Sequence, residues 1–356
     1  MGRNVLAAFL ADNPDCRVSV LIRRSSLNVP SGERVFVVEG DLSVPHLGLV
    51  PACRERLRAS VTEIVHCGAD IRFNLPIETA RSVNVSGTAG VLQLARECGK
   101  LRKLVHISTT FVAGRHAGVF PEAPFTQTAG FFSSYQESKY EAEQLVFAAA
   151  RELPAAVFRL SSIIGTWRTG AVEQWNHFHQ LLRLAPCNPL PVLPCAPGAR
   201  ADFVASDWAT SAIAVLMSRH FESGSVWNLC AGARHSLQVA EVIEAAFSAY
   251  GRTRMPELVT PEEFDRWTAA RLQRGDSRLA TLLTALHYVL PYFSLRQEFD
   301  NQRTLGVLAA NGVLFPDSRE LLERVLRCCV EPFSGPGGTS VQDGLAILPS
   351  SRAAVE

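Results

Sequence analysis

The sequence of 356 residues has no excess of either charge: 35 lysine and arginine residues stand against 34 aspartate and glutamate residues. Such a balance produces no strong field to attract nucleic acid or an anionic membrane, because both need clustered cations. No apolar run approaches the roughly 18 residues that a membrane-spanning helix needs, and no signal peptide opens the chain. These absences favour a small-molecule partner and a protein without a membrane span.

The nine cysteines lack the spacings that would give them a structural task. There is no CxxC pair and no accompanying pair of histidines, so neither a zinc site nor a disulfide framework is predicted. Unpaired thiols are typical of proteins in a reducing compartment. We therefore expect reduced, mostly buried cysteines and a cytoplasmic protein.

What the chain does have is an alternation of short apolar runs and helical stretches. Near-continuous apolar runs are typical of parallel strands that are covered on both faces. Strands separated by helices predict βαβ units and an α/β fold with a doubly wound, Rossmann-like parallel sheet. The expected strands are 18–22, 35–38, 63–67, 103–107, 156–160 and 226–229, and the expected helices are 3–12, 77–98, 134–153, 208–220 and 237–250.

Two stretches break this rhythm. Residues 166–200 contain five prolines, and the chain after residue 250 turns mostly helical. We interpret residues 166–200 and 232–333 as a smaller, mostly helical substrate-binding cap. The dinucleotide-binding domain would then consist of residues 1–165, with 201–231 returning to it. Glycine and serine are frequent in residues 334–356, which we expect to form a flexible, solvated tail.

A tyrosine and a lysine four residues apart, in the string SSYQESKYEAEQL, are the candidates for chemistry. The spacing places Tyr135 and Lys139 on one face of a helix. An ammonium beside a phenol stabilises the phenolate, so we expect Lys139 to lower the tyrosine pKa from about 10 towards neutrality. A tyrosine tuned in this way can exchange a proton with a carbonyl oxygen as hydride arrives or leaves. An ordinary surface helix is the alternative interpretation of this motif.

A run of hydroxyl side chains ends an expected strand 26 residues before Tyr135, in the string LVHISTTFVAG. In open α/β sheets, ligands bind at the carboxyl ends of the strands. The hydroxyl of Thr109 is therefore a candidate to hold the same carbonyl. Local capping of the strand end by Ser108, Thr109 and Thr110 is the alternative.

Together these motifs resemble those of the extended short-chain dehydrogenase/reductase family. The resemblance covers about residues 2 to 250 and implies that Thr109 positions the carbonyl, Tyr135 is the acid/base and Lys139 also holds the nicotinamide ribose. Asn84 would support the active-site helix, with plain helix packing as the alternative. The matching strings are HCGAD (66–70), NVSGTAGVLQLA (84–95), HISTTFVAG (106–114), YQESK (135–139), FRLSSIIG (158–165) and ADFVASDWATSAI (201–213). The implied cofactor-binding residues are Gly2, Arg23, Arg24, Asp41, Leu42, Cys67, Gly68, Ala69, Asn84, Ser108, Tyr135, Lys139, Ser161, Ser162 and Ile163.

Within that family the strings are most similar to the thioester reductase and fatty acyl reductase (male-sterility type) branch. Three features carry this similarity: the string STT-F-VAG, the glutamate pair in SKYEAEQL, and LPYFSLRQEFDN at 290–301. Enzymes of that branch take an acyl chain from a carrier-protein or coenzyme A thioester and release an aldehyde or alcohol. The alternatives are another extended-family enzyme, such as a sugar-nucleotide epimerase, a dehydratase or a hydroxysteroid-type dehydrogenase, and a non-catalytic dinucleotide-binding or truncated protein.

The cofactor prediction comes from the end of the strand 18–22, where Arg23 and Arg24 follow. Arginine at this place suits the 2′-phosphate of NADP(H), whereas an NAD enzyme places a carboxylate there. We see no acidic residue nearby, so NADP(H) is favoured over NAD(H), with two solvated arginines as the alternative.

The opening of the chain departs from the family, whose first strand is followed by a T-G-x-x-G-x-x-G turn that cradles the pyrophosphate. Here Gly2 would be the last glycine of that motif, and the strand and two glycines are missing. We expect a slot between two buried strands and impaired cofactor binding, caused by a wrong start site or a real truncation.

Overall fold

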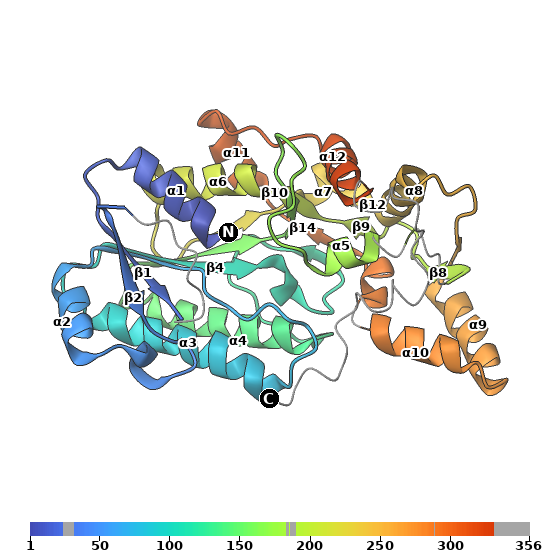
Figure 1. Cartoon of the computed structure of the whole chain (residues 1–356), viewed down its shortest axis with the longest axis horizontal. Coiled ribbons are helices and arrows are strands. Elements are labelled where there is room, and N and C mark those ends of the chain that lie inside the picture. The colour runs from blue at the N-terminus through green and yellow to red at the C-terminus, as the bar shows by residue number, and fades with distance from the viewer. Residues whose placement is uncertain (24–31, 183–184, 186–189, 288, 331–356) are drawn as a thin grey trace.

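Parallel strands with helices on both faces form the body of the molecule (Figure 1). The computed structural model describes residues 1–23, 32–182, 185, 190–287 and 289–330. Its larger sheet has four parallel strands in the order β11-β6-β4-β3, and a second sheet pairs β1 with β2. These strands are β1 (Val18–Ile22), β2 (Val35–Glu39), β3 (Glu63–His66), β4 (Lys103–Thr109), β6 (Ala155–Leu160) and β11 (Val226–Leu229).

All six strands lie where the apolar runs predict them, with bounds that differ by at most two residues. The reason is burial: every residue of β6 and β11 is buried, as a strand covered on both faces must be. The five expected helices are also found, as α1 (Gly2–Asp12), α3 (Ile77–Glu97), α4 (Ser134–Ala149), α6 (Ser206–Arg219) and α8 (Val239–Ala249). One early helix, α2 (Pro51–Ser60), is not foreseen, because it buries a single side chain, Leu57.

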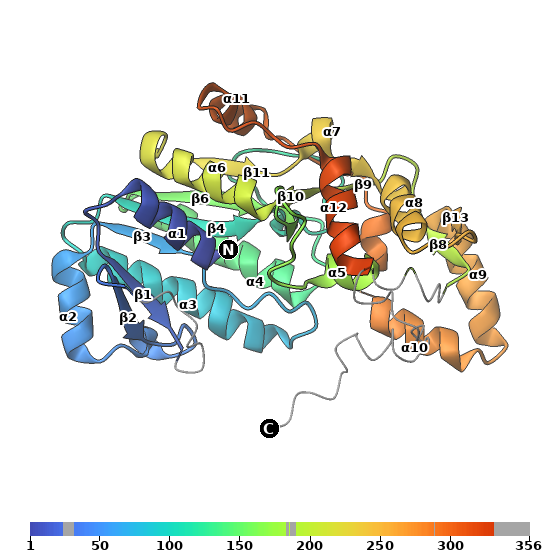
Figure 2. The ribbon, with the colours of Figure 1, turned by 45° about the horizontal axis from the view of Figure 1, so that its top comes forward.

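The helices form two layers, with α3 packed against α4 on one face of the sheet and α1 against α6 on the other (Figures 1 and 2). The remaining helices are α5 (His177–Leu182), α7 (Gly232–His235), α9 (Pro261–Gln273), α10 (Ser277–Leu286), α11 (Gln302–Ala310) and α12 (Ser318–Val330). The shorter strands are β5 (Gly118–Phe120), β7 (Ser162–Gly165), β8 (Val192–Pro194), β9 (Arg200–Ala201), β10 (Phe203–Ala205), β12 (Leu237–Gln238), β13 (Glu257–Val259) and β14 (Gln297–Phe299), and single 3₁₀ turns span Pro45–Gly48, Thr110–Ala113 and Leu290–Phe293.

The parallel sheet is interrupted. Strand β1 pairs only with β2, strand β3 pairs only with β4, and no strand joins the two sheets in the described part of the chain. This matches the slot that the sequence leads us to expect. Thr109, one of the candidate residues, lies at the end of β4 in the four-stranded sheet.

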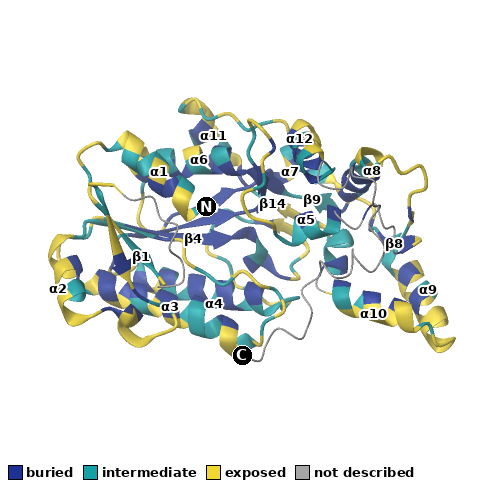
Figure 3. Cartoon of the chain, viewed as in Figure 1, coloured by how far each residue is buried: buried dark blue, intermediate teal, exposed yellow. Residues whose placement is uncertain are grey.

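A separate, smaller core lies at the end of the molecule occupied by β8, α9 and α10 (Figure 3). Its buried side chains come from both segments interpreted as the cap, and they are Leu190, Val192, Phe264, Leu279, Leu282, Leu286 and Leu290. Side chains of α8, α11 and α12 belong instead to the main core, among them Val242, Leu308 and Leu322. The expected tail, 334–356, lies outside the described residues.

Candidate active site

A cleft of about 520 Å³ opens where the carboxyl ends of β4 and β6 meet the start of α4. Most of the residues singled out from the sequence line it. They are Gly2, Cys67, Ala69, Ser108, Thr109, Tyr135, Lys139, Ser161, Ser162 and Ile163. Residues from five separate parts of the chain thus meet at one site, as the carboxyl edge of a parallel sheet requires.

The start of α4 fixes the tyrosine. Ser133 caps the helix by accepting a hydrogen bond from the Gln136 amide, and the Ser134 hydroxyl donates to the Leu75 carbonyl at 2.8 Å. The Tyr135 ring stacks on Phe73 with ring centroids 5.4 Å apart. Helix capping and ring stacking therefore hold the phenol in the cleft before any substrate arrives.

Thr109 caps the end of its strand, which is one of the two roles considered from the sequence. Its hydroxyl accepts a hydrogen bond from the Phe111 amide at 3.2 Å and so caps the turn that follows β4. It also hydrogen-bonds to the Tyr135 hydroxyl. Both residues line the cleft.

Lys139 is 3% exposed, and its ammonium donates to the Ile107 carbonyl at 3.0 Å. The same nitrogen lies 3.4 Å from His106 Nε2. Burial lowers the pKa of Lys139 to about 8, and the carboxylate of Glu143 offsets part of that effect. Burial also holds the pKa of His106 well below its usual value, so the imidazole beside the ammonium is neutral.

The expected lowering of the tyrosine pKa is wrong for this arrangement. Burial raises the pKa of Tyr135 to about 12, and only the hydrogen bond with Thr109 acts in the opposite direction. The Lys139 ammonium is directed to the Ile107 carbonyl rather than to the phenol. Tyr135 is therefore fully protonated at neutral pH, which suits a proton donor better than a proton acceptor.

Asn84 supports the active-site helix, and it is not among the residues that line the cleft. Its side chain is 2% exposed and exchanges hydrogen bonds with the Asp70 backbone at 2.8 and 3.0 Å. It also donates to the Ser138 hydroxyl at 2.9 Å. Because its amide is fully used in joining α3 to α4 and to the loop after β3, Asn84 has no donor left for a cofactor.

The cleft suits a dinucleotide in its chemistry. The hydroxyls of Ser108 and Ser206 are buried, have no hydrogen-bond partner among the described residues and belong to residues that line the cleft, so they are ready to bind a ligand. Ser206 was not singled out from the sequence, although it stands within the string ADFVASDWATSAI. Met1 and Gly2, at the start of α1, also line the cleft. Leu42 packs against Gly68, where an added Cβ would lie 2.7 Å from it.

The surroundings of Arg23 differ from the expectation. Its positive charge contributes to lowering the pKa of both Asp41 and Asp70, so two carboxylates lie within its electrostatic reach. Asp70 follows β3, far from Arg23 in sequence, and is bound by Arg72 at 2.6 Å. The expectation that no acidic residue stands near Arg23 is therefore wrong. Arg24 lies outside the described residues.

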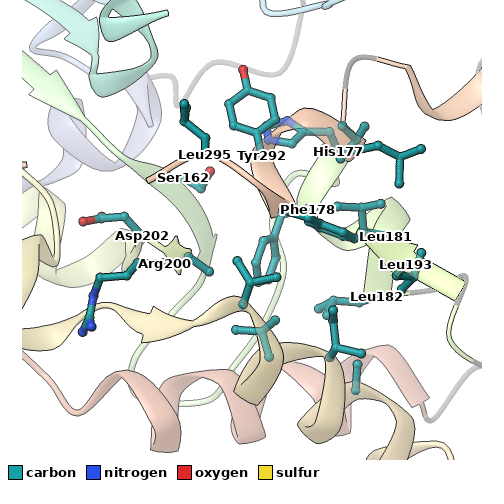
Figure 4. A pocket seen from close by; sticks show the side chains of 18 of the residues that line it. Ser162, His177, Phe178, Leu181, Leu182, Leu193, Arg200, Asp202, Tyr292 and Leu295 are labelled. Atoms are coloured by element: carbon teal, nitrogen blue, oxygen red, sulfur yellow. The ribbon is translucent and has the colours of Figure 1, made fainter. Parts of the chain in front are cut away.

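A second cavity, of about 180 Å³ and mainly apolar, adjoins the cleft (Figure 4). The two share the lining residues Phe111, Ser161, Ser162, His177 and Val289. His177 packs its ring 4.4 Å from Phe73 and 5.5 Å from Phe111, measured between centroids. Sequence reasoning missed this cavity, and the only signal was the aromatic string WNHFHQLL at 175–182.

Comparison with known proteins agrees with this geometry. The family model described as male sterility protein, an NAD-binding domain, matches residues 24–213. A solved structure, the terminal R domain from the myxalamid PKS-NRPS biosynthetic pathway, superimposes with a TM-score of 0.75 at 26% identity. That match covers 95% of this chain and 90% of the R domain.

Curated relatives resemble part of the chain. Fatty acyl-CoA reductase wat of Drosophila melanogaster is 29% identical over 160 residues, which cover 38% of this chain and 31% of that protein. The isonitrile lipopeptide synthase of Streptomyces coeruleorubidus is 32% identical over 167 residues, covering 46% of this chain and 11% of that protein. The chain thus spans less than a third of the length of either relative. With more than half of its residues matched by the family model, the chain belongs to the male sterility protein family.

Proposed function

We propose that the protein is an NADPH-dependent reductase of acyl thioesters, presented by coenzyme A or by a carrier protein, that releases an aldehyde or an alcohol. The observation that carries the proposal is the position of Thr109 and Tyr135 beside a mainly apolar cavity. A thioester has a carbonyl for the two hydroxyls and an acyl tail for the cavity. A sugar nucleotide would need many polar partners there, because hydroxyls buried without partners are costly.

The bound nicotinamide would supply the hydride to the thioester carbonyl carbon. Thr109 and Tyr135 would hold the carbonyl oxygen, and Tyr135 would give it a proton as the carbon–oxygen double bond is reduced. Loss of the thiol from that carbon then leaves the aldehyde. Lys139 would bind the nicotinamide ribose, and the free hydroxyls of Ser108 and Ser206 would bind the cofactor from within the cleft.

NADP(H) is the cofactor we propose, with Arg23 as the partner of the 2′-phosphate. Arg23 is exposed at the end of β1 and so can reach a ligand. The nearby carboxylates of Asp41 and Asp70 reduce this preference, although Arg72 already neutralises Asp70. A carrier protein or coenzyme A as the acyl donor, and a cytoplasmic location, stay predictions.

Loss of NADPH absorbance on addition of octanoyl-coenzyme A tests this function, with aldehyde and alcohol products identified by mass spectrometry. The control is the Tyr135→Phe variant at equal concentration. Oxidation of NADPH that depends on both acyl thioester and Tyr135 is the expected result. No oxidation with any acyl thioester, by a protein that binds NADPH, would refute it.

A further inference from the structure

We infer that the cavity beside the catalytic cleft selects the acyl chain: it accepts a tail of about six to eight carbons that ends in an apolar group. This inference rests on the proposed thioester reduction and adds the substrate's length and end group. It follows from where the cavity lies, what lines it and how large it is.

The cavity runs away from the reacting carbonyl. Its mouth is formed by the residues that it shares with the cleft, including Phe111 and His177. Four residues on one face of α8 line the cavity and not the cleft: Val242, Ile243, Ala246 and Phe247. A thioester whose carbonyl lies at Tyr135 would therefore point its tail towards α8.

The mouth carries no charge. Burial lowers the pKa of His177 to about 4, so its imidazole is neutral at physiological pH. Its neighbours Phe73 and Phe111 are apolar rings. An uncharged aromatic mouth admits a hydrocarbon chain without the cost of removing water from an ion.

The two charged side chains that line the cavity, Arg200 and Asp202, are already bound elsewhere. The Asp202 carboxylate accepts hydrogen bonds from the amides of Ala231 and Gly232 at 2.9 and 2.7 Å. The Arg200 guanidinium donates to the Ser236 hydroxyl at 2.7 Å. In Figure 4 the charged ends of Arg200 and Asp202 point away from the leucine and phenylalanine side chains. A tail with a charged end would thus be buried without a partner, which is strongly unfavourable.

The volume of the cavity sets the length of the acyl tail that it can hold. A buried apolar cavity of about 150 Å³ binds benzene, which has six carbons. At about 180 Å³ this cavity is slightly larger. A chain of about six to eight carbons fills it, and each methylene that it can bury should improve kcat/KM about fourfold, since a buried CH₂ contributes about 0.8 kcal/mol.

The test is the ratio of kcat/KM among butanoyl-, octanoyl- and palmitoyl-coenzyme A, with binding of the same thioesters measured by calorimetry. Octanoyl should exceed butanoyl by at least about tenfold, since up to four more methylenes are buried. Palmitoyl should show no further gain, and an eight-carbon tail that ends in a carboxylate should lose about 100-fold or more. Equal values for all lengths, a maximum at palmitoyl, or tolerance of the terminal carboxylate would overturn the inference.

Two variants in the cavity lining test the assignment of its walls. Ala246→Leu adds bulk to the wall of the cavity, so the preference should move from octanoyl to butanoyl, whereas the control Ala249→Leu, exposed on the same helix, should leave it unchanged. Leu193→Ala enlarges the cavity and should move the preference to longer chains. This second variant keeps the inference testable even if Ala246→Leu does not fold. If both lining variants bind and reduce all lengths in the wild-type ratio, the inference is wrong. Absence of turnover with every thioester would instead contradict the proposed function, and the calorimetric ratio would still decide the chain length.

Discussion

The two sides of the cleft are built differently. On the catalytic side, β4 and β6 are almost wholly buried, and Tyr135 and Lys139 are held by buried neighbours. On the side of β1 and β2 the strands are largely half-buried or exposed, with Val37 at 53% exposure, and Arg23 is exposed. In the proposed reductase, the reacting groups would therefore be positioned before ligands bind, while recognition of the adenosine end would depend on a few surface charges.

The catalytic side is tested most strongly by Tyr135→Phe. We expect turnover to fall by about 10²–10⁴, the usual contribution of a general acid, while NADPH affinity stays within a few-fold. The control is Tyr140→Phe on the same helix, since that hydroxyl only accepts a hydrogen bond from the Gln127 amide. Steady-state kinetics and fluorescence titration separate the two effects. Near-normal turnover of Tyr135→Phe would place the proton donor elsewhere.

The next largest effect is expected from the buried ion pair that supports α4. Glu143, one turn after Lys139, accepts two 3.1 Å hydrogen bonds from Arg159 Nε, and neither side chain is more than 1% exposed. Glu143→Gln leaves the buried arginine without its counter-charge, although Arg159 still donates to the Pro121 and Ala123 carbonyls. It should lower the free energy of unfolding by about 3–5 kcal/mol.

Chemical denaturation measures the change in stability, and the exposed pair of Arg96 and Glu152 provides the control. Glu152→Gln should lower the free energy of unfolding by less than about 1 kcal/mol. Equal effects of the two substitutions would mean that this buried pair does not contribute specially to the stability of the catalytic side.

The sequence predicts those features that are local in the chain or that repeat along it. The six strands could be predicted because each is a continuous apolar run, and Tyr135 and Lys139 because they share a helix. It missed the pairing of Glu143 with Arg159 and the cavity, since both form between elements distant in sequence. The predicted direction of the Tyr135 pKa shift was wrong because burial, which no motif reports, raises that pKa by more than the hydrogen bond with Thr109 lowers it.

The adenosine side is tested by Arg23→Asp. If Arg23 binds the 2′-phosphate, each lost charge-assisted hydrogen bond contributes about 1.5–3 kcal/mol. NADPH affinity should therefore fall about 10–100-fold, while NADH affinity changes little. The melting temperature serves as the control, because Arg23 is exposed and its loss should not disturb the fold. An unaltered preference would move the phosphate site to Arg24 or favour NADH as the cofactor.

The smallest expected effect is a pH dependence of cofactor binding, which comes from a residue on the catalytic side. Because burial lowers the pKa of Lys139 to about 8, its ammonium is present below that pH and is lost above it. Tyr135, with a pKa of about 12, does not titrate in this range. NADPH is anionic and should bind the charged lysine better, so its dissociation constant should rise about tenfold between about pH 7 and about pH 9. Lys139→Met removes the titrating group, and its weaker binding should be flat over the same range. A wild-type profile as flat as that of Lys139→Met would show that the lysine charge does not contribute to cofactor binding, and the catalytic side would then act on the substrate alone.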